Sequence, residues 1–166
     1  MLKPGQKGAI AEAAVLAAAV KLHIPVLVPF NDGGRYDLVF DLGERLARVQ
    51  CKWGGLHGGI VRARLCTSRL TPAGYVRTTY NLGEIDAFAV FCQALDRCYW
   101  LPIEEFADHS HVHLRLTPAR NNQRQLVKWA AQYEFGAIAQ LGERLAGSQK
   151  VAGSSPASST LAKPSS

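Results

Sequence analysis

The chain has 166 residues, which is enough for one domain with a hydrophobic core and too few for two. Apolar residues make up 48% of it and charged residues 19%, as in an ordinary globular protein, which argues against a disordered or membrane-embedded chain. Nineteen Lys and Arg against thirteen Asp and Glu give a net charge of +6. This excess suits a polyanionic partner such as nucleic acid, but it equally suits a basic soluble protein.

The cysteines and the apolar N-terminal stretch predict a cytoplasmic protein. None of the four cysteines forms a CxxC pair, and they lie within or close to apolar runs, so buried free thiols are expected: Cys51, Cys66, Cys92 and Cys98. Glu12 interrupts the apolar residues 9–20 and Lys21 ends them. The stretch is too short to span a bilayer, so neither export nor a membrane location is predicted.

The first part of the chain predicts one helix followed by strands. Residues 9–22 are rich in Ala, Val and Leu and predict a mostly buried helix that ends before Pro25. Residues 25–30 predict a short buried strand, and the Asn-Asp-Gly-Gly sequence at 31–34 predicts a turn. Two further strands are expected at 36–42 and 45–53, joined by a turn at Gly43.

The second part predicts more strands and a closing helix. Alternating or apolar runs predict strands at 60–70, 85–92 and 97–102, and residues 75–84 between the first two are irregular and basic. One helical turn is expected at 103–107 and a closing helix at 121–135, where apolar residues have helical spacing. The predicted fold is α/β, with a mixed central sheet of four to five strands flanked by helices.

The C-terminal residues 136–160 resemble the translation of a transfer RNA gene. Codons for residues 138–144 can spell a D-arm, codons for 153–156 can spell a T-arm, and the two lie fifteen codons apart. We therefore divide the chain into a domain at 1–135 and a disordered tail at 136–166. An ordinary flexible tail is the alternative. A gene beside a transfer RNA gene is typical of mobile elements.

Two strand segments carry the residues that indicate chemistry. Positions two apart on a strand share a face, so Gln50 and Lys52 point together while Val49 and Cys51 point into the core. Asp37 lies on the preceding strand of the same hairpin. A carboxylate, an amide oxygen and an ammonium group can therefore meet at one edge of the sheet, with the Cys51 carbonyl as a further oxygen donor.

These groups suit a magnesium site. Mg²⁺ prefers hard oxygen ligands, and Lys52 could orient or deprotonate the attacking water and stabilise charge on a phosphate. Glu12 is an acid in an apolar helix, and a buried carboxylate needs a partner. The metal site is one candidate partner, and an ion pair with Lys7 or Arg35 is the other.

Lys7-Gly8, Glu12, the segment 35–39 (Arg-Tyr-Asp-Leu-Val) and the segment 49–52 (Val-Gln-Cys-Lys) together resemble the PD-(D/E)XK nuclease superfamily over about residues 5–105. The resemblance is greatest to small bacterial endonucleases related to group I intron homing enzymes. It implies a restriction-endonuclease-like core and metal-dependent DNA cleavage, with Mg²⁺ or Mn²⁺ as the cofactor.

By this resemblance Asp37 matches the motif aspartate, Gln50 the (D/E) position, Lys52 the lysine and Glu12 the helix glutamate. The metal ligands would be Glu12, Asp37, Gln50 and the Cys51 carbonyl. Gln50 departs from the motif, because most members carry an acid there, and a neutral ligand should weaken metal binding. Three alternatives stay open: a Holliday-junction resolvase, a catalytically inactive DNA-binding protein, and the product of a degenerating gene.

Cations and amides elsewhere predict the DNA-binding surface. Phosphates attract Lys and Arg, while amide side chains can read base edges; the candidates are Lys7, Arg35, Arg62, Arg64, Arg69, Arg77, Arg120, Asn121 and Asn122. A solvated basic face and a capped helix start are the structural alternatives. One small domain offers little surface to DNA, so a homo-oligomer is expected.

Three alternating histidines raise the question of a second metal site. His109, His111 and His113 would share one strand face, but no fourth ligand stands at a recognised zinc spacing. We therefore expect a row of surface or half-buried histidines.

Overall fold

The computed structural model describes residues 2–31, 33–118 and 127–138. Arg120, Asn121 and Asn122 lie outside these residues, as does the predicted tail from residue 139 onward. In the described part of the chain, no helix is both long and apolar enough to cross a membrane.

The predicted N-terminal helix is confirmed and begins earlier than expected. Helix α1 spans Pro4–Lys21, with a proline in its first turn, where the missing N–H has no intrahelical partner to lose. The side chain of Gln6 accepts the backbone N–H of Lys3 at 2.9 Å and caps this end. Ala11, Val15 and Ala19 are fully buried, so the helix packs its small apolar side chains onto the sheet.

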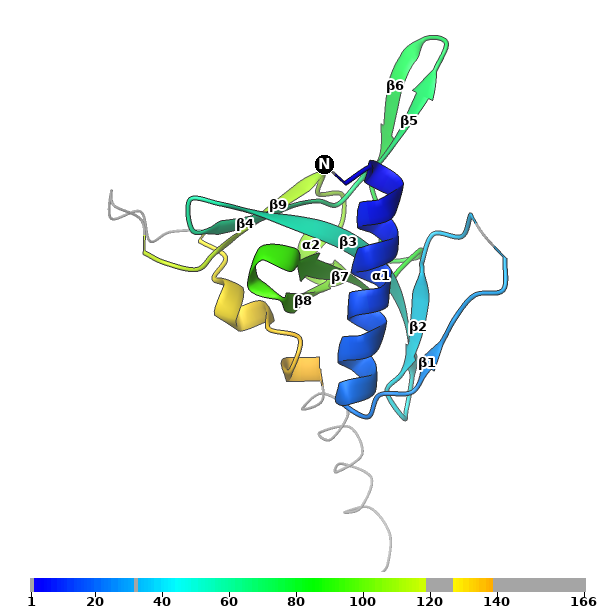
Figure 1. Ribbon diagram of the computed structural model, residues 1–166. Helices are drawn as coiled ribbons and strands as arrows, with labels where there is room; N and C mark the ends of the chain where they lie inside the picture. The colour runs from blue at the N-terminus through cyan, green and yellow to red at the C-terminus, as the bar shows by residue number, and fades with distance from the viewer. Residues whose placement is uncertain (1, 32, 119–126, 139–166) are drawn as a thin grey trace, which may run out of the picture.

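The sheet is mixed, as predicted, but within the described residues it has seven strands in place of four or five. Every pairing is antiparallel except that of β3 with β7, which is parallel. The strands are β1 (Val26–Leu27), β2 (Leu38–Asp41), β3 (Leu46–His57), β4 (Ile60–Arg64), β7 (Ala87–Cys92), β8 (Arg97–Pro102) and β9 (His111–Arg115). Figure 1 shows α1 lying across one face of this sheet.

Strand β3 is the centre of the sheet and carries two partners along one edge. Val49 pairs with both β2 and β7, so these two strands flank it on opposite edges. Gly54 pairs with both β4 and β7, so β4 lies on the same edge as β2. A Cβ at Gly54 would lie only 2.9 Å from Val90 and 3.0 Å from Val61, so this crowded crossing needs a glycine.

Two hydrophobic clusters lie on the two faces of the sheet. The first packs under α1 and includes Val49 and Cys51, as the strand alternation predicted. The second includes Phe88 and Leu101 from the sheet and is covered by α2 (Ile103–Phe106) and the short 3-10 helix η2 (Ala130–Tyr133). The helical turn predicted at 103–107 is thus confirmed.

Several predicted elements are corrected by the structure. The strand expected at 25–30 has only two residues at the sheet edge, where Leu27, Val28 and Phe30 stay exposed. Residues 127–135 do not form the predicted closing helix, because only η2 is helical there. The stretch 60–78 forms three strands, β4, β5 (Thr67–Thr71) and β6 (Gly74–Thr78), so part of the irregular region 75–84 is a strand.

The folded domain extends past the predicted boundary at residue 135. Ile138 is fully buried in the cluster beneath α1. Phe135 stands next to it in that cluster and packs edge-on against Phe40 and Trp100, with ring centroids 5.9 Å and 6.3 Å away. Residues 136–138 therefore belong to the domain, because the apolar side chain of Ile138 completes its core.

Candidate active site

Asp37 closes a gap between two neighbouring strands. Its backbone N–H donates to the carbonyl of Val49 at 2.9 Å, just where the β2–β3 ladder ends. Its carboxylate oxygen Oδ2 then accepts the backbone N–H of Cys51 at 2.8 Å, a hydrogen bond that a neighbouring strand would otherwise accept. The edge of β3 thus fixes the Asp37 carboxylate between the β2 and β4 pairings.

Gln50 reaches the same carboxylate from the face of β3. Its Nε2 donates to Asp37 Oδ2 at 2.5 Å and lies 3.5 Å from the Cys51 carbonyl oxygen. Gln50 is only 7% exposed, so its amide needs a hydrogen-bond partner within the protein, and Asp37 provides one. A carboxamide can donate to a carboxylate where a second carboxylate would repel it, so Gln50 and Asp37 can approach closely.

Lys52 lies two residues along β3 from Gln50, and the two side chains share one face, as the alternation predicted. Its Nζ donates to the hydroxyl of Tyr80 at 3.3 Å and stands 4.9 Å from the centroid of that ring. Burial lowers the pKa of Lys52, while the nearby Asp37 carboxylate opposes the shift. The ammonium group is therefore held in a partly dry position beside the carboxylate.

Arg35 also contacts Tyr80. Its guanidinium carbon lies 3.9 Å from the ring centroid, and its Nε donates to Glu84 at 2.8 Å. The same guanidinium donates to the Thr79 carbonyl. Burial raises the pKa of Tyr80 to about 12, so the phenol stays neutral between two cations. Arg35, predicted to bind DNA, contacts Tyr80, Glu84 and the Thr79 carbonyl in the structure.

Glu12 approaches the site from α1. Glu12 and Asp37 line one cavity of about 130 Å³, which residues of the loop before β2 enclose. Burial raises the pKa of the Cys51 thiol, and the charges of Asp37 and Glu12 add to that rise, so both carboxylates act on the same point of β3. Helix and strand together place two acids near one opening.

The donor set fits a hard cation rather than a soft one. Across residues 2–31, 33–118 and 127–138, no three His, Cys, Asp or Glu side chains gather where they could hold a metal. Two carboxylates, the Gln50 amide and the Cys51 carbonyl remain, and all of these groups offer oxygen. Oxygen donors without thiolate or imidazole suit Mg²⁺ or Mn²⁺.

The predicted DNA-binding cations fall on three different parts of the fold. Arg62 and Arg64 are exposed on β4, opposite His113 and His111 of β9, on the α1 side of the sheet. Lys7 lies on the same side, with Nζ 5.7 Å from the Trp53 ring centroid. The histidines predicted to share a face do so at His111 and His113, which are exposed. Arg69 and Arg77 lie on the β5–β6 hairpin.

Tyr80 is the residue of this site that sequence reasoning missed. It lies 28 residues beyond Lys52 in the chain, within the stretch 75–84 predicted to be irregular. A buried tyrosine beside a lysine leaves no spacing signal in one sequence. Only the return of the chain from β6 toward β7 brings it under Lys52.

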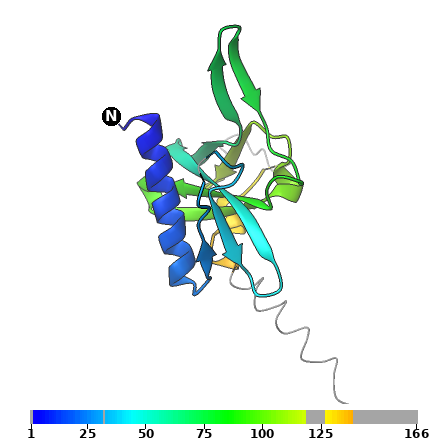
Figure 2. The same cartoon turned by 90° about the vertical axis from the view of Figure 1, so that its right-hand side faces the viewer.

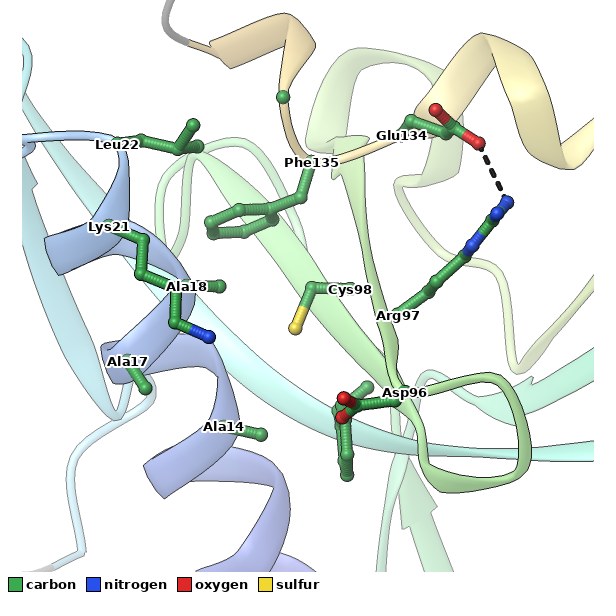
Figure 3. Close-up of a pocket in the computed structure, with 12 residues that line it drawn as sticks. Ala14, Ala17, Ala18, Lys21, Leu22, Asp96, Arg97, Cys98, Glu134 and Phe135 are labelled. Carbon is green, nitrogen blue, oxygen red and sulfur yellow. Dashed lines mark hydrogen bonds and ion pairs between the residues drawn. The ribbon is translucent and has the colours of Figure 1, made fainter.

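A larger cavity of about 510 Å³ shares no residue with the Asp37 site. It opens near the C-terminal end of α1 and is lined by Lys21, Cys98 and Phe135, with the Arg97–Glu134 ion pair at its rim (Figure 3). Burial raises the pKa of Cys98 to about 11, so this thiol is a poor nucleophile at neutral pH. The Cys98 thiol therefore gives this cavity no activated nucleophile.

Comparison with known proteins indicates a family and a similar fold. Residues 2–136 match a family model described as PD-(D/E)XK endonuclease. The structure resembles that of a bacterial homing endonuclease, I-Ssp6803I, with a TM-score of 0.71 and 26% sequence identity, over 89% of this chain and 99% of that one. No curated protein matches the sequence.

Proposed function

Because this chain belongs to the PD-(D/E)XK endonuclease family, we propose that it is a metal-dependent endonuclease that hydrolyses phosphodiester bonds in DNA. One observation carries the proposal: Asp37 and Gln50 are in direct contact, with Lys52 on the same strand face. Glu12 lines the cavity beside Asp37. The resemblance to a homing endonuclease supports a homing-type enzyme that acts at specific DNA sites.

Four groups would hold the cation: the carboxylates of Glu12 and Asp37, the Gln50 amide oxygen and the Cys51 carbonyl. A divalent cation, Mg²⁺ or Mn²⁺, would supply Lewis acidity beside the scissile phosphate. Asp37 fixes the position of this site, because its carboxylate is anchored to the backbone of β3. The hydrogen bond from Nε2 to Asp37 keeps the Gln50 amide beside the site, and the amide would turn over to offer its oxygen to the cation.

Lys52 would stabilise the negative charge that develops on the phosphate during cleavage. Its ammonium group donates to the Tyr80 hydroxyl and is shielded from bulk water. A charge in such a shielded position interacts more strongly with the phosphate than a charge on the open surface would. Lys7, Arg62 and Arg64 would bind phosphates farther along the DNA. A homo-oligomer would bring several such domains to one DNA site.

Removal of divalent metal tests the proposal directly. Purified full-length protein should nick and linearise supercoiled plasmid in Mg²⁺ or Mn²⁺ and lose this activity completely in excess EDTA, because no other group of the site supplies Lewis acidity. Gel electrophoresis of the plasmid forms measures the result. DNA binding without any metal-dependent cleavage would contradict the proposal and would identify a catalytically inactive DNA-binding protein.

Gln50→Glu tests the role of the unusual amide. A second carboxylate beside Asp37 should tighten Mg²⁺ binding about 10-fold, because the site gains a charge. The same change should lower the stability of the metal-free protein by about 1–2 kcal/mol, since two adjacent carboxylates repel each other. Calorimetric titration with Mg²⁺ and urea unfolding with EDTA measure the two effects.

Gln93→Glu provides the control for Gln50→Glu, because Gln93 is exposed and starts a short 3-10 helix. It adds the same charge away from the site. Unchanged metal affinity in Gln50→Glu would place the cation elsewhere than beside Gln50.

A further inference from the structure

The β5–β6 hairpin is a two-stranded ribbon that projects from the body of the protein (Figures 1 and 2). Five residue pairs join Thr67–Thr71 to Gly74–Thr78 in a sheet of their own. Eight of these ten residues are exposed, and Thr71 and Gly74 are half-buried. A hairpin with both faces in water gains little stability from packing, so its persistence in the fold calls for a binding partner.

The charge of the ribbon suits DNA. Residues 67–78 contain two arginines, four hydroxyl side chains besides the Tyr75 phenol, and no acid. Arg69 and Arg77 lie in neighbouring pairs, so they point to opposite faces. An acid-free cationic ribbon is attracted to phosphates from either side.

The two faces differ in what they can offer to bases. One face carries Ser68 opposite Arg77 and Leu70 opposite Tyr75, and the latter two are 67% and 73% exposed. On the other face the hydroxyls of Thr67 and Thr71 already donate to backbone carbonyls within the ribbon. That face also carries Arg69 opposite Val76. The first face differs by the larger apolar groups of Leu70 and Tyr75 and by the Ser68 hydroxyl beside the Arg77 guanidinium, which suit thymine methyls and guanine edges.

The size and the attachment of the ribbon fit a groove beside the cleavage site. The major groove of B-DNA is about 12 Å wide and admits a two-stranded β-ribbon. Five residues per strand reach about 17 Å, close to the rise of five base pairs. Two residues after β6 the chain arrives at Tyr80, whose hydroxyl accepts from Lys52. A ribbon in the groove would thus lie next to the scissile bond.

We propose that the β5–β6 ribbon enters the major groove of the DNA substrate and reads base pairs with the face that carries Ser68, Leu70, Tyr75 and Arg77. Arg69, on the opposite face, binds phosphate. The inference rests on the proposed nuclease function, since it assumes that DNA is the substrate. It makes the ribbon the element that determines where the enzyme cuts.

The test selects preferred duplexes from a library with a randomised central segment. The selection and the binding measurements use full-length protein that carries Asp37→Asn, so that the DNA stays uncut in Mg²⁺. Arg77→Lys keeps the charge but loses the fork that pairs with guanine, so affinity for the selected duplex should fall roughly 10- to 100-fold. Affinity for a scrambled duplex should change less than about 3-fold. Arg69→Lys is the matched control and should leave both affinities within that range.

Replacement of residues 70–75 by Asn-Gly shortens the ribbon through a two-residue turn and keeps the rest of the chain. This variant should lose the preference for the selected duplex. The same shortening in a protein that retains Asp37 should leave plasmid cleavage in Mg²⁺ intact. An unaltered preference in Arg77→Lys, or its loss in Arg69→Lys alone, overturns the proposal. The proposal is also overturned if the shortened variant keeps its preference for the selected duplex but changes its oligomeric state. That result would identify the ribbon as a contact between copies of the chain.

The assays separate this inference from the proposed function. Plasmid cleavage without any enriched sequence would overturn base reading by the ribbon and leave the nuclease standing. An enriched sequence without metal-dependent cleavage would overturn the nuclease and leave the ribbon as a DNA-reading element.

Discussion

Replacement of Asp37 by asparagine is expected to reduce the rate of metal-dependent DNA cleavage by about 10³-fold or more while the protein still folds. The asparagine oxygen can still accept the backbone N–H of Cys51, which keeps the edge of β3 closed. Gln50 Nε2 donates to the same oxygen, Oδ2, so an asparagine oxygen in that position accepts from Gln50 as well and no donor is left facing a donor. What disappears is the negative charge that would hold the cation.

Cleavage rates on plasmid, with circular dichroism and urea unfolding of the same preparations, measure this expectation. Asp96→Asn is the matched control, because Asp96 is exposed and has φ 49°, a conformation that asparagine tolerates well. It removes the same charge away from the site and should cleave as the unaltered chain does. Equal cleavage by Asp37→Asn would mean that the reaction takes place elsewhere in the protein or in a contaminant.

Ile138→Ala is expected to lower the free energy of unfolding by about 2–4 kcal/mol. The Ile138 side chain is fully buried in the cluster beneath α1, in a region where Phe135 fills the space between Phe40 and Trp100. Removing three carbons there leaves a cavity that packed aromatic rings cannot readily close. Urea unfolding of the full-length chain measures the change.

Ala137→Ser is the control for Ile138→Ala, since Ala137 is exposed and its substitution should change stability by less than about 0.5 kcal/mol. The result bears on the origin of the C-terminal residues. Ile138 falls within the stretch that resembles a translated transfer RNA gene, yet its side chain completes the core. A loss in Ile138→Ala no larger than in the control would show that the domain ends before residue 138.

The arrangement of side chains on β3 could be predicted from the sequence because its signals are local. Alternation along β3 assigned Val49 and Cys51 to the core and Gln50 and Lys52 to the opposite face, and the structure confirms that assignment. Asp37 could be joined to them because a short hairpin connects its segment to β3. Contacts between adjacent strands depend on few residues, so one sequence suffices to infer them.

The Tyr80 contact, the ribbon and the end of the domain were decided by the tertiary structure. Tyr80 reaches Lys52 only after the chain has passed through the whole β5–β6 hairpin. Strand β6 fell within the stretch predicted to be irregular, because both faces of the hairpin are exposed, which erases the apolar alternation that normally marks a strand. Residues 127–135 carried helical spacing, but their apolar side chains pack on two different clusters.

What the sequence determined by itself is the family and the arrangement of the residues on β3, because both follow from motif order and strand period. What only the tertiary structure decided is which distant residues meet that strand and how far the domain extends. Such contacts depend on how the remaining strands pair and on which surfaces are left to bury, and neither is encoded in a local pattern.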